Sequence, residues 1–155
     1  AIMVGSDKDV YNKILPVLRY MGKDILHCGK SGTGQLTKIL NNMILFETVV
    51  ALSEAANIAE QYGMNVENLY ENITKCSGDS FALRNHGLKS IAKNNFPSPS
   101  FSSEYALKDL SYALELGQKL NVKMPGALSA ENLLKTSIKN GDKDLYFPVM
   151  KKYFS

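Results

Sequence analysis

The chain has 155 residues, a length that suits one domain. Hydrophobic residues make up 45% of it and charged residues 21%, so it can bury a core, and disordered, collagen-like and low-complexity classes are excluded. The formal net charge of +3 is too small to indicate a nucleic-acid partner. Two widely separated cysteines, Cys28 and Cys76, fit a reducing compartment, and we expect the cytoplasm, or the mitochondrial matrix in a eukaryote.

The first residues predict a short β-strand. Ile2–Val4 are apolar and are followed by the turn residues Gly-Ser-Asp, and no other segment gives a convincing strand signal. A lone strand would leave backbone groups unpaired, so we expect that the rest of its sheet lies outside this chain. From Asp7, a candidate N-cap, the pattern is helical as far as Gly22. Residues 25–26 then lead toward a glycine-rich turn over residues 29–34, and His27 and Cys28 are expected to form a structural turn before it.

A long helix is predicted over residues 35–62. Its apolar residues cover nearly the whole circumference, which is typical of a helix buried on all sides. Glu47, Glu54 and Asn57 within it argue against a membrane span. We expect it to be the central post of an all-α helical bundle, with a β stub at the front and with contacts to a second subunit. Shorter helices are predicted over residues 66–75, 83–93, 104–120, 125–139 and 145–153.

The glycine-rich turn matches neither of two phosphate-binding motifs. Gly29 and Gly34 have the spacing of a P-loop, but Gln35 stands where the motif requires Lys. A dinucleotide fingerprint requires a third glycine at the position of Thr37. We therefore interpret the segment as a flexible turn into the long helix.

Lys38 is the strongest candidate for a chemical role. It lies about one turn inside the long helix, with Asn42 four residues further on the same face and Asn41 beside it. The helix dipole and apolar neighbours disfavour a positive charge there, which favours the neutral amine that a general acid/base needs. Two alternatives stay open: Lys38 packs its stem and extends its ammonium to water, and the asparagines form a helix–helix hydrogen-bonding pair.

The order of motifs resembles the β-hydroxyacid dehydrogenases, which include the 3-hydroxyisobutyrate dehydrogenases. Residues 32–42 (GTGQLTKILNN) are similar to the family signature GxGxxxKxxNN. Phe101 with Lys108 and Asp109 resembles its F-x6-K-D-L segment, and residues 141–144 resemble its G-x-x-D turn. The resemblance covers nearly the whole chain.

The resemblance implies roles for individual residues. Lys38 would be the catalytic acid/base, and Asn42, Asn41 and Gly34 would bind the substrate. Phe101 would line the substrate pocket.

Two further roles concern the predicted helix over residues 104–120. By resemblance, Lys108 would approach the nicotinamide end of the cofactor, and Asp109 would contact the substrate and orient the lysines. From the residues alone, Lys108 and Asp109 would more often be a solvated ion pair. His27 and His86 lack partners at zinc-ligand spacing, so no metal is expected, and Lys151–Lys152 is interpreted as a solvated helix end.

The resemblance also implies a domain organisation. Residues 1–6 would be a remnant strand of an absent nucleotide-binding domain, which would bind most of the NAD or NADP. Residues 7–155 would be the helical substrate and oligomerisation domain, similar in fold to the C-terminal domain of 6-phosphogluconate dehydrogenase. Such a fragment is expected to be inactive alone.

The expected substrate is a small hydroxyacid or semialdehyde such as 3-hydroxyisobutyrate, and the expected assembly is a homodimer or homotetramer. Asn41 stands where the 6-phosphogluconate dehydrogenases carry His, which argues against a phosphorylated sugar acid. Two other classes stay open. One is a non-catalytic oligomerisation or partner-binding scaffold derived from the family, and the other is a free-standing helical binding module.

Overall fold

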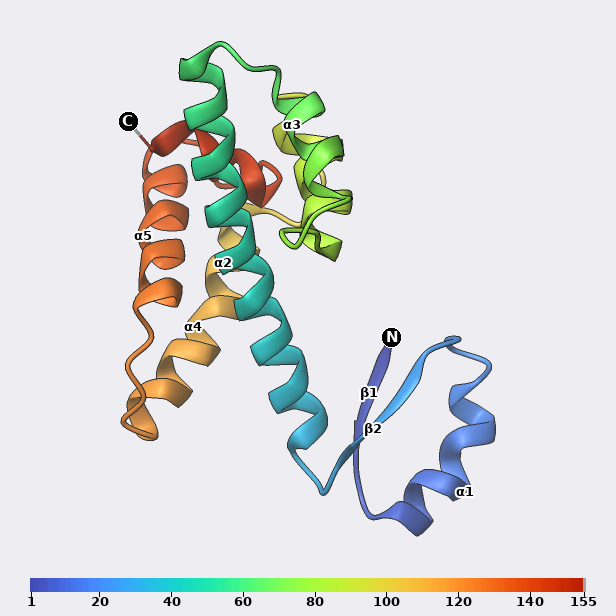
Figure 1. Cartoon of the computed structure of the whole chain (residues 1–155). Helices are drawn as coiled ribbons and strands as arrows, with labels where there is room; N and C mark the ends of the chain where they lie inside the picture. The colour runs from blue at the N-terminus through green and yellow to red at the C-terminus, as the bar shows by residue number, and fades with distance from the viewer. Residues whose placement is uncertain (155) are drawn as a thin grey trace. The chain divides into compact units, whose positions relative to one another are not determined.

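A computed structural model describes residues 1–154 (Figure 1). The expected end of the helical domain at residue 155 lies outside the described residues. The chain forms two compact units, of which the first is Ala1–Asn42 and the second begins at Met43. The boundary expected after residue 6 differs from this division, because residues 7–29 complete a small supersecondary unit with the first strand.

The first unit contains a second strand that the sequence analysis missed. β1 (Ile2–Gly5), α1 (Lys8–Leu18) and β2 (Ile25–Gly29) follow one another, and the two strands pair in parallel with Ile2 opposite Ile25. The expectation of a lone strand is therefore wrong. Parallel strands require a crossover connection, and α1 supplies it, so the pairing partner lies about 20 residues along the chain.

Side chains fix β2 within this unit. The Tyr11 hydroxyl on α1 donates a hydrogen bond to the Ile25 carbonyl oxygen at 3.1 Å. The His27 Nε2 atom lies 2.8 Å from the Ser6 carbonyl oxygen, which ties β2 to the loop after β1. His27 and Cys28 thus lie in a strand and not in the expected turn.

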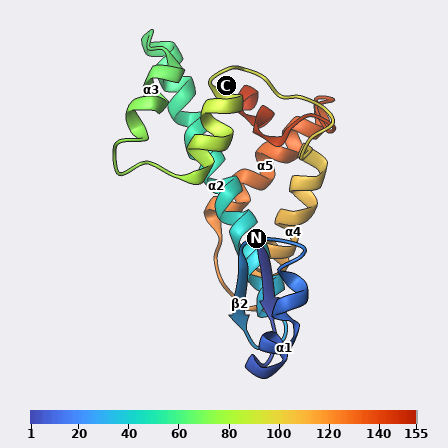
Figure 2. The ribbon, with the colours of Figure 1, turned by 90° about the vertical axis from the view of Figure 1, so that its right-hand side faces the viewer.

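The second unit is helical, as predicted. α2 (Thr33–Tyr62) contributes its first residues to the first unit and the remainder to the second. The remaining elements are α3 (Val66–Ile73), the π-helix η1 (Leu83–Ile91), α4 (Ser103–Lys119), α5 (Pro125–Lys139) and the 3₁₀-helix η2 (Phe147–Tyr153). α4 packs against α5, and η2 packs against both (Figures 1 and 2).

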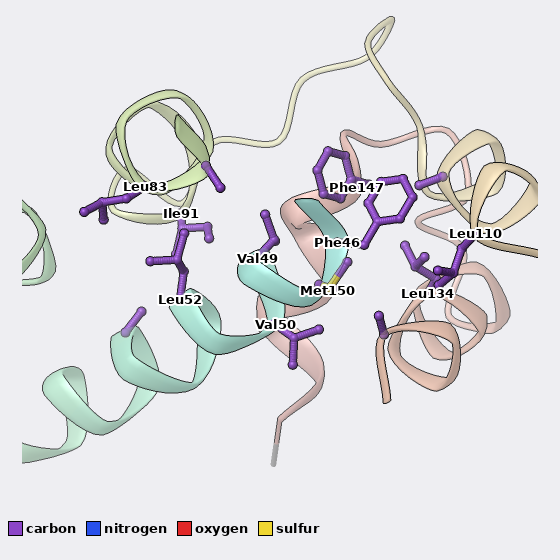
Figure 3. Packing of buried hydrophobic residues seen from close by; sticks show 14 of the residues in the cluster. Phe46, Val49, Val50, Leu52, Leu83, Ile91, Leu110, Leu134, Phe147 and Met150 are labelled. Carbon is purple, nitrogen blue, oxygen red and sulfur yellow. The ribbon is translucent and has the colours of Figure 1, made fainter. Parts of the chain in front are cut away.

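Buried side chains from every helix of the second unit form one core (Figure 3). The aromatic ring of Phe46 on α2 meets that of Phe147 on η2 edge-on, with centroids 5.2 Å apart. The buried Tyr70 hydroxyl donates to the Leu52 carbonyl oxygen at 2.6 Å, so its polar atom is satisfied. The core includes Phe46, Val49, Leu52, Leu83, Ile91, Leu110, Leu134, Phe147 and Met150.

α2 is not buried on all sides within this chain, which corrects the sequence-based expectation. Ile44 and Ile58 are 60% and 71% exposed, whereas Phe46 and Val49 are fully buried. Among the described residues, α2 alone is long and apolar enough to cross a membrane by length and composition. A core helix meets the same criterion, and the packing of Phe46 and Val49 in the core gives α2 that role.

Candidate functional site

The start of α2 packs closely against β1, and this contact needs glycine. A Cβ atom built on the buried Gly34 would lie 2.5 Å from the Met3 carbonyl oxygen. Real Cβ atoms do not approach backbone atoms so closely, so any side chain would push the helix away from the strand. The Thr33 hydroxyl donates to the Lys30 carbonyl oxygen at 2.6 Å and fixes the turn that enters the helix. The structure thus gives Gly34 a packing role, and its contact with substrate stays a prediction.

Lys38, Asn41 and Asn42 lie within the first three turns of α2, all within the first unit. Lys38 and Asn42 are half-buried and lie on the same face, since residues four apart in a helix are neighbours. Asn41 is exposed, and its amide nitrogen donates to the Asn42 side-chain oxygen at 3.3 Å. An ammonium, with amide donors and acceptors four residues away, can bind and protonate the oxygen atoms of a small polar molecule.

The second group of predicted residues lies on α4 and just before it. The side-chain oxygen of Ser102 accepts a hydrogen bond from the Tyr105 backbone N–H at 3.2 Å and caps the helix. The Lys108 ammonium lies 3.3 Å from Asp109 Oδ1. The side chain of Lys108 is 45% exposed and that of Asp109 only 5%, so the interpretation as a solvated pair is wrong for Asp109.

The ammonium of Lys108 also lies over an aromatic ring. Its Nζ atom is 3.7 Å from the centroid of the Tyr105 ring, a cation–π contact. Desolvation, the largest single effect, lowers the pKa of Lys108, but interactions with the Tyr105 and Asp109 side chains outweigh it and raise this pKa above its usual value. Lys108 is therefore held in its charged form.

Phe101 connects this group to the core. Its ring is half-buried and packs edge-on against Phe147, with centroids 5.4 Å apart. On another side it meets the Tyr105 ring, with centroids 5.6 Å apart at 69°. The backbone N–H of Phe147 donates to the Phe101 carbonyl oxygen at 3.0 Å, which fixes the loop before α4. Phe101 thus sets where the Tyr105 ring lies.

Sequence reasoning missed the pair of His86 on η1 and Tyr146 just before η2. The His86 Nδ1 atom is hydrogen-bonded to the Tyr146 hydroxyl. Burial, with a smaller effect of the charge on Lys89, lowers the pKa of His86, and burial raises the pKa of Tyr146. The two residues are 60 positions apart, so no local pattern could have joined them.

Lys151 is buried, whereas the sequence analysis placed it at a solvated helix end. Its side chain is 5% exposed, and its ammonium lies 2.6 Å from Glu60 Oε1. It also donates to the Asn94 side-chain oxygen at 2.8 Å. Lys152 remains half-exposed and lies 3.2 Å from Asp142. The two neighbouring lysines differ in exposure because consecutive residues of η2 face different directions.

The structure therefore places the predicted residues in two groups, one in each unit. Lys38, Asn41 and Asn42 form the first, and the second consists of Phe101 and the Lys108–Asp109 pair. The half-exposed Lys108 ammonium of the second group can donate hydrogen bonds to amide or phosphate oxygens, and its contact with a cofactor stays a prediction. Across residues 1–154, no cluster of three or more His, Cys, Asp or Glu could hold a metal ion.

A family model described as the NAD-binding region of NADP-dependent 3-hydroxyisobutyrate dehydrogenase matches residues 32–153. A 2-(hydroxymethyl)glutarate dehydrogenase of Eubacterium barkeri is 40% identical over 80% of this chain and 41% of its own length. The structure of Mycobacterium tuberculosis 3-hydroxyisobutyrate dehydrogenase with L-serine is 30% identical, with a TM-score of 0.86 over 97% of this chain and 53% of that one. A structure of Psf3 with NADP⁺ and 2-OPP shares the fold, with 19% identity and a TM-score of 0.77 over 96% of this chain and 51% of that one.

These matches define the class as NAD(P)-dependent oxidoreductases of the β-hydroxyacid dehydrogenase type. The chain belongs to the 3-hydroxyisobutyrate dehydrogenase family, as its motifs predicted. NAD(P) is the cofactor of this family, which agrees with the sequence-based expectation. The chain spans about half the length, or less, of the relatives that it matches.

Proposed function

We propose that this chain is the substrate-binding and catalytic-lysine half of an NAD(P)-dependent oxidoreductase. Its substrate is a small β-hydroxyacid or the corresponding semialdehyde, such as 3-hydroxyisobutyrate. The observation that carries the proposal is the pair of Lys38 and Asn42 on one face of α2, inside the segment that the family model matches.

Lys38 handles the proton in this proposal. During reduction its ammonium donates a proton to the carbonyl oxygen, and during oxidation its amine accepts the hydroxyl proton. The Asn42 and Asn41 amides hold the substrate's carboxylate or reacting oxygen through hydrogen bonds. The start of α2 is the positive end of its helix dipole, which favours an anionic group nearby.

NAD(P), when bound, accepts or supplies the hydride. Lys108 contacts the nicotinamide end of the cofactor, and the buried carboxylate of Asp109 orients the Lys108 ammonium. Phe101 supplies an apolar wall for the carbon atoms of the substrate. Most of the cofactor is bound by a nucleotide-binding domain outside this chain, to which β1 contributes. The greater length of the relatives supports this organisation, in which the present chain alone is inactive.

The assembly in this proposal is a homodimer or homotetramer. The exposed apolar residues Ile44 and Ile58 on α2 support it, because subunit contacts bury such side chains. Both cysteines are free, which supports a reducing location such as the cytoplasm or the mitochondrial matrix.

Replacing Lys38 in the full-length protein tests the proposal. Lys38→Ala should lower kcat for oxidation of 3-hydroxyisobutyrate with NAD⁺ or NADP⁺ by about 10²–10⁴-fold, the usual contribution of general acid–base catalysis. The matched control is Lys13→Ala, which removes an exposed lysine of α1 in the same unit and should leave turnover unchanged. Unchanged turnover in a folded Lys38→Ala variant would contradict the catalytic role of Lys38, whereas no turnover by the unmodified full-length protein would favour the non-catalytic scaffold.

A further inference from the structure

We propose that Tyr105 is a positioning residue, whose ring holds the Lys108 ammonium ready to contact NAD(P). The inference rests on the proposed function, because it assigns Lys108 to the cofactor. Tyr105 acts through Lys108 and does not itself touch the reacting atoms.

The geometry of α4 brings the two side chains together. Tyr105 and Lys108 are three residues apart and therefore lie on one face of the helix. The ammonium has two anchors, the Tyr105 ring at 3.7 Å from its centroid and the Asp109 carboxylate oxygen at 3.3 Å. A free lysine side chain samples many rotamers, and ordering one on binding costs free energy. The two anchors restrict Lys108 before any ligand arrives.

Tyr105 is itself held in place from the protein side. Its backbone N–H is bonded to the Ser102 side chain, and its ring packs edge-on against Phe101. Phe101 in turn packs against the buried Phe147. Because the core determines the position of the Tyr105 ring, the ring can determine the position of the ammonium.

Tyr105 and Lys108 are both partly exposed to water. Tyr105 is 53% exposed and the Lys108 side chain 45%, so part of the ammonium is available to a ligand. Desolvation lowers the pKa of Lys108, but the Tyr105 and Asp109 side chains outweigh it and raise this pKa, so they favour the charged ammonium. A charged donor of fixed position suits the amide and phosphate oxygens of a dinucleotide.

Variants of the full-length protein test this role, with NAD(P)H binding followed by fluorescence titration and with steady-state kinetics. Tyr105→Ala should raise both the Kd and the KM for the cofactor about two- to fivefold, the size of a cation–π contact at an exposed site. Its kcat should change little, since the contact exists before the transition state. Tyr105→Phe keeps the ring but removes the hydroxyl, which also interacts with Lys108, so its increase in Kd should be smaller than that of Tyr105→Ala.

Tyr112 provides the matched control. It lies on the same helix and is also half-exposed, but its ring centroid is 6.0 Å from the Lys108 ammonium. Tyr112→Ala should therefore raise the Kd less than Tyr105→Ala does. Should Tyr105→Ala fail to fold, Tyr105→Leu keeps an apolar contact with Phe101 without the ring, and the same increase in Kd is expected.

A double-mutant cycle decides whether Tyr105 acts through Lys108. In a Lys108→Ala background, Tyr105→Ala should cause no further loss of cofactor binding. Additive losses, or an unchanged Kd in a folded Tyr105→Ala variant, overturn the inference and leave the proposed function intact. An unmodified protein that neither binds nor turns over NAD(P)H overturns both.

Discussion

Gly5 and Gly34 pack against each other with no room for a side chain on either. A Cβ built on Gly5 would lie 2.8 Å from the Gly34 nitrogen, and one built on Gly34 would lie 2.9 Å from the Gly5 nitrogen. The contact joins the end of β1 to the start of the helix that carries Lys38. The path of the chain into the candidate site therefore depends on two glycines that need not touch a ligand.

Gly34→Ala should destabilise the protein by about 1–3 kcal/mol, because the added methyl group meets backbone atoms that cannot move aside as a side chain would. Urea unfolding measures this change in the free energy of unfolding. Gly22→Ala is the control, since its methyl group would meet only the side chain of Ile2, at 3.3 Å. Equal effects of the two substitutions would contradict the packing role.

The Lys151–Glu60 ion pair should respond unequally to loss of its two partners. Glu60→Gln leaves a lysine that is only 5% exposed without its carboxylate, and should cost about 1–3 kcal/mol. Lys151→Met should cost less, because the Glu60 side chain is 41% exposed and water can solvate it. Thermal unfolding of both variants measures the difference, and a loss for Lys151→Met as large as that for Glu60→Gln, or larger, would contradict this prediction.

His86 should make the protein less stable in acid. Its pKa is lowered in the folded state, so the unfolded chain binds a proton first as the pH falls below about 6.5. Stability from this group is therefore present at neutral pH and decreases as the pH falls from about 6.5 through the lowered folded-state value. Urea unfolding at pH 7.5 and pH 5 should show a smaller acid-induced loss in His86→Gln than in the unmodified protein. Identical losses in the two proteins would mean that His86 does not contribute to the loss of stability in acid.

The N-cap of α4 should stabilise the segment that carries Lys108. Ser102→Ala removes the acceptor for the Tyr105 N–H and should cost about 1 kcal/mol, whereas Ser102→Asp should retain the cap. Ser111→Ala is a matched control, because that hydroxyl only donates to the Lys108 carbonyl oxygen, within the helix. Chemical denaturation compares the three variants, and a loss of stability as large for Ser111→Ala as for Ser102→Ala would argue against the cap.

The helices could be predicted from the sequence because their signals are local. Apolar spacing, Pro125 at a first turn and Gly141 after an end place α5 at the observed bounds, Pro125–Lys139. The motif of residues 32–42 likewise indicated Lys38 as a candidate, whose role stays a prediction, and it indicated the family, which the family model confirms. β2 could not be predicted in this way. Its five residues become a strand only by pairing with β1, across an intervening helix.

The sequence by itself thus determined the helices and the candidate lysine, because each depends on residues within a few turns of one another. It also determined the family, because the motifs follow one another in the family's order along the chain. Only the tertiary structure decided the burial of Lys151, the hydrogen bond of His86 to Tyr146 and the contact between Gly5 and Gly34. Each of these joins residues that are separated along the chain by 29 to 91 positions. Burial and pairing at such separations follow from packing, which no local pattern of residues specifies.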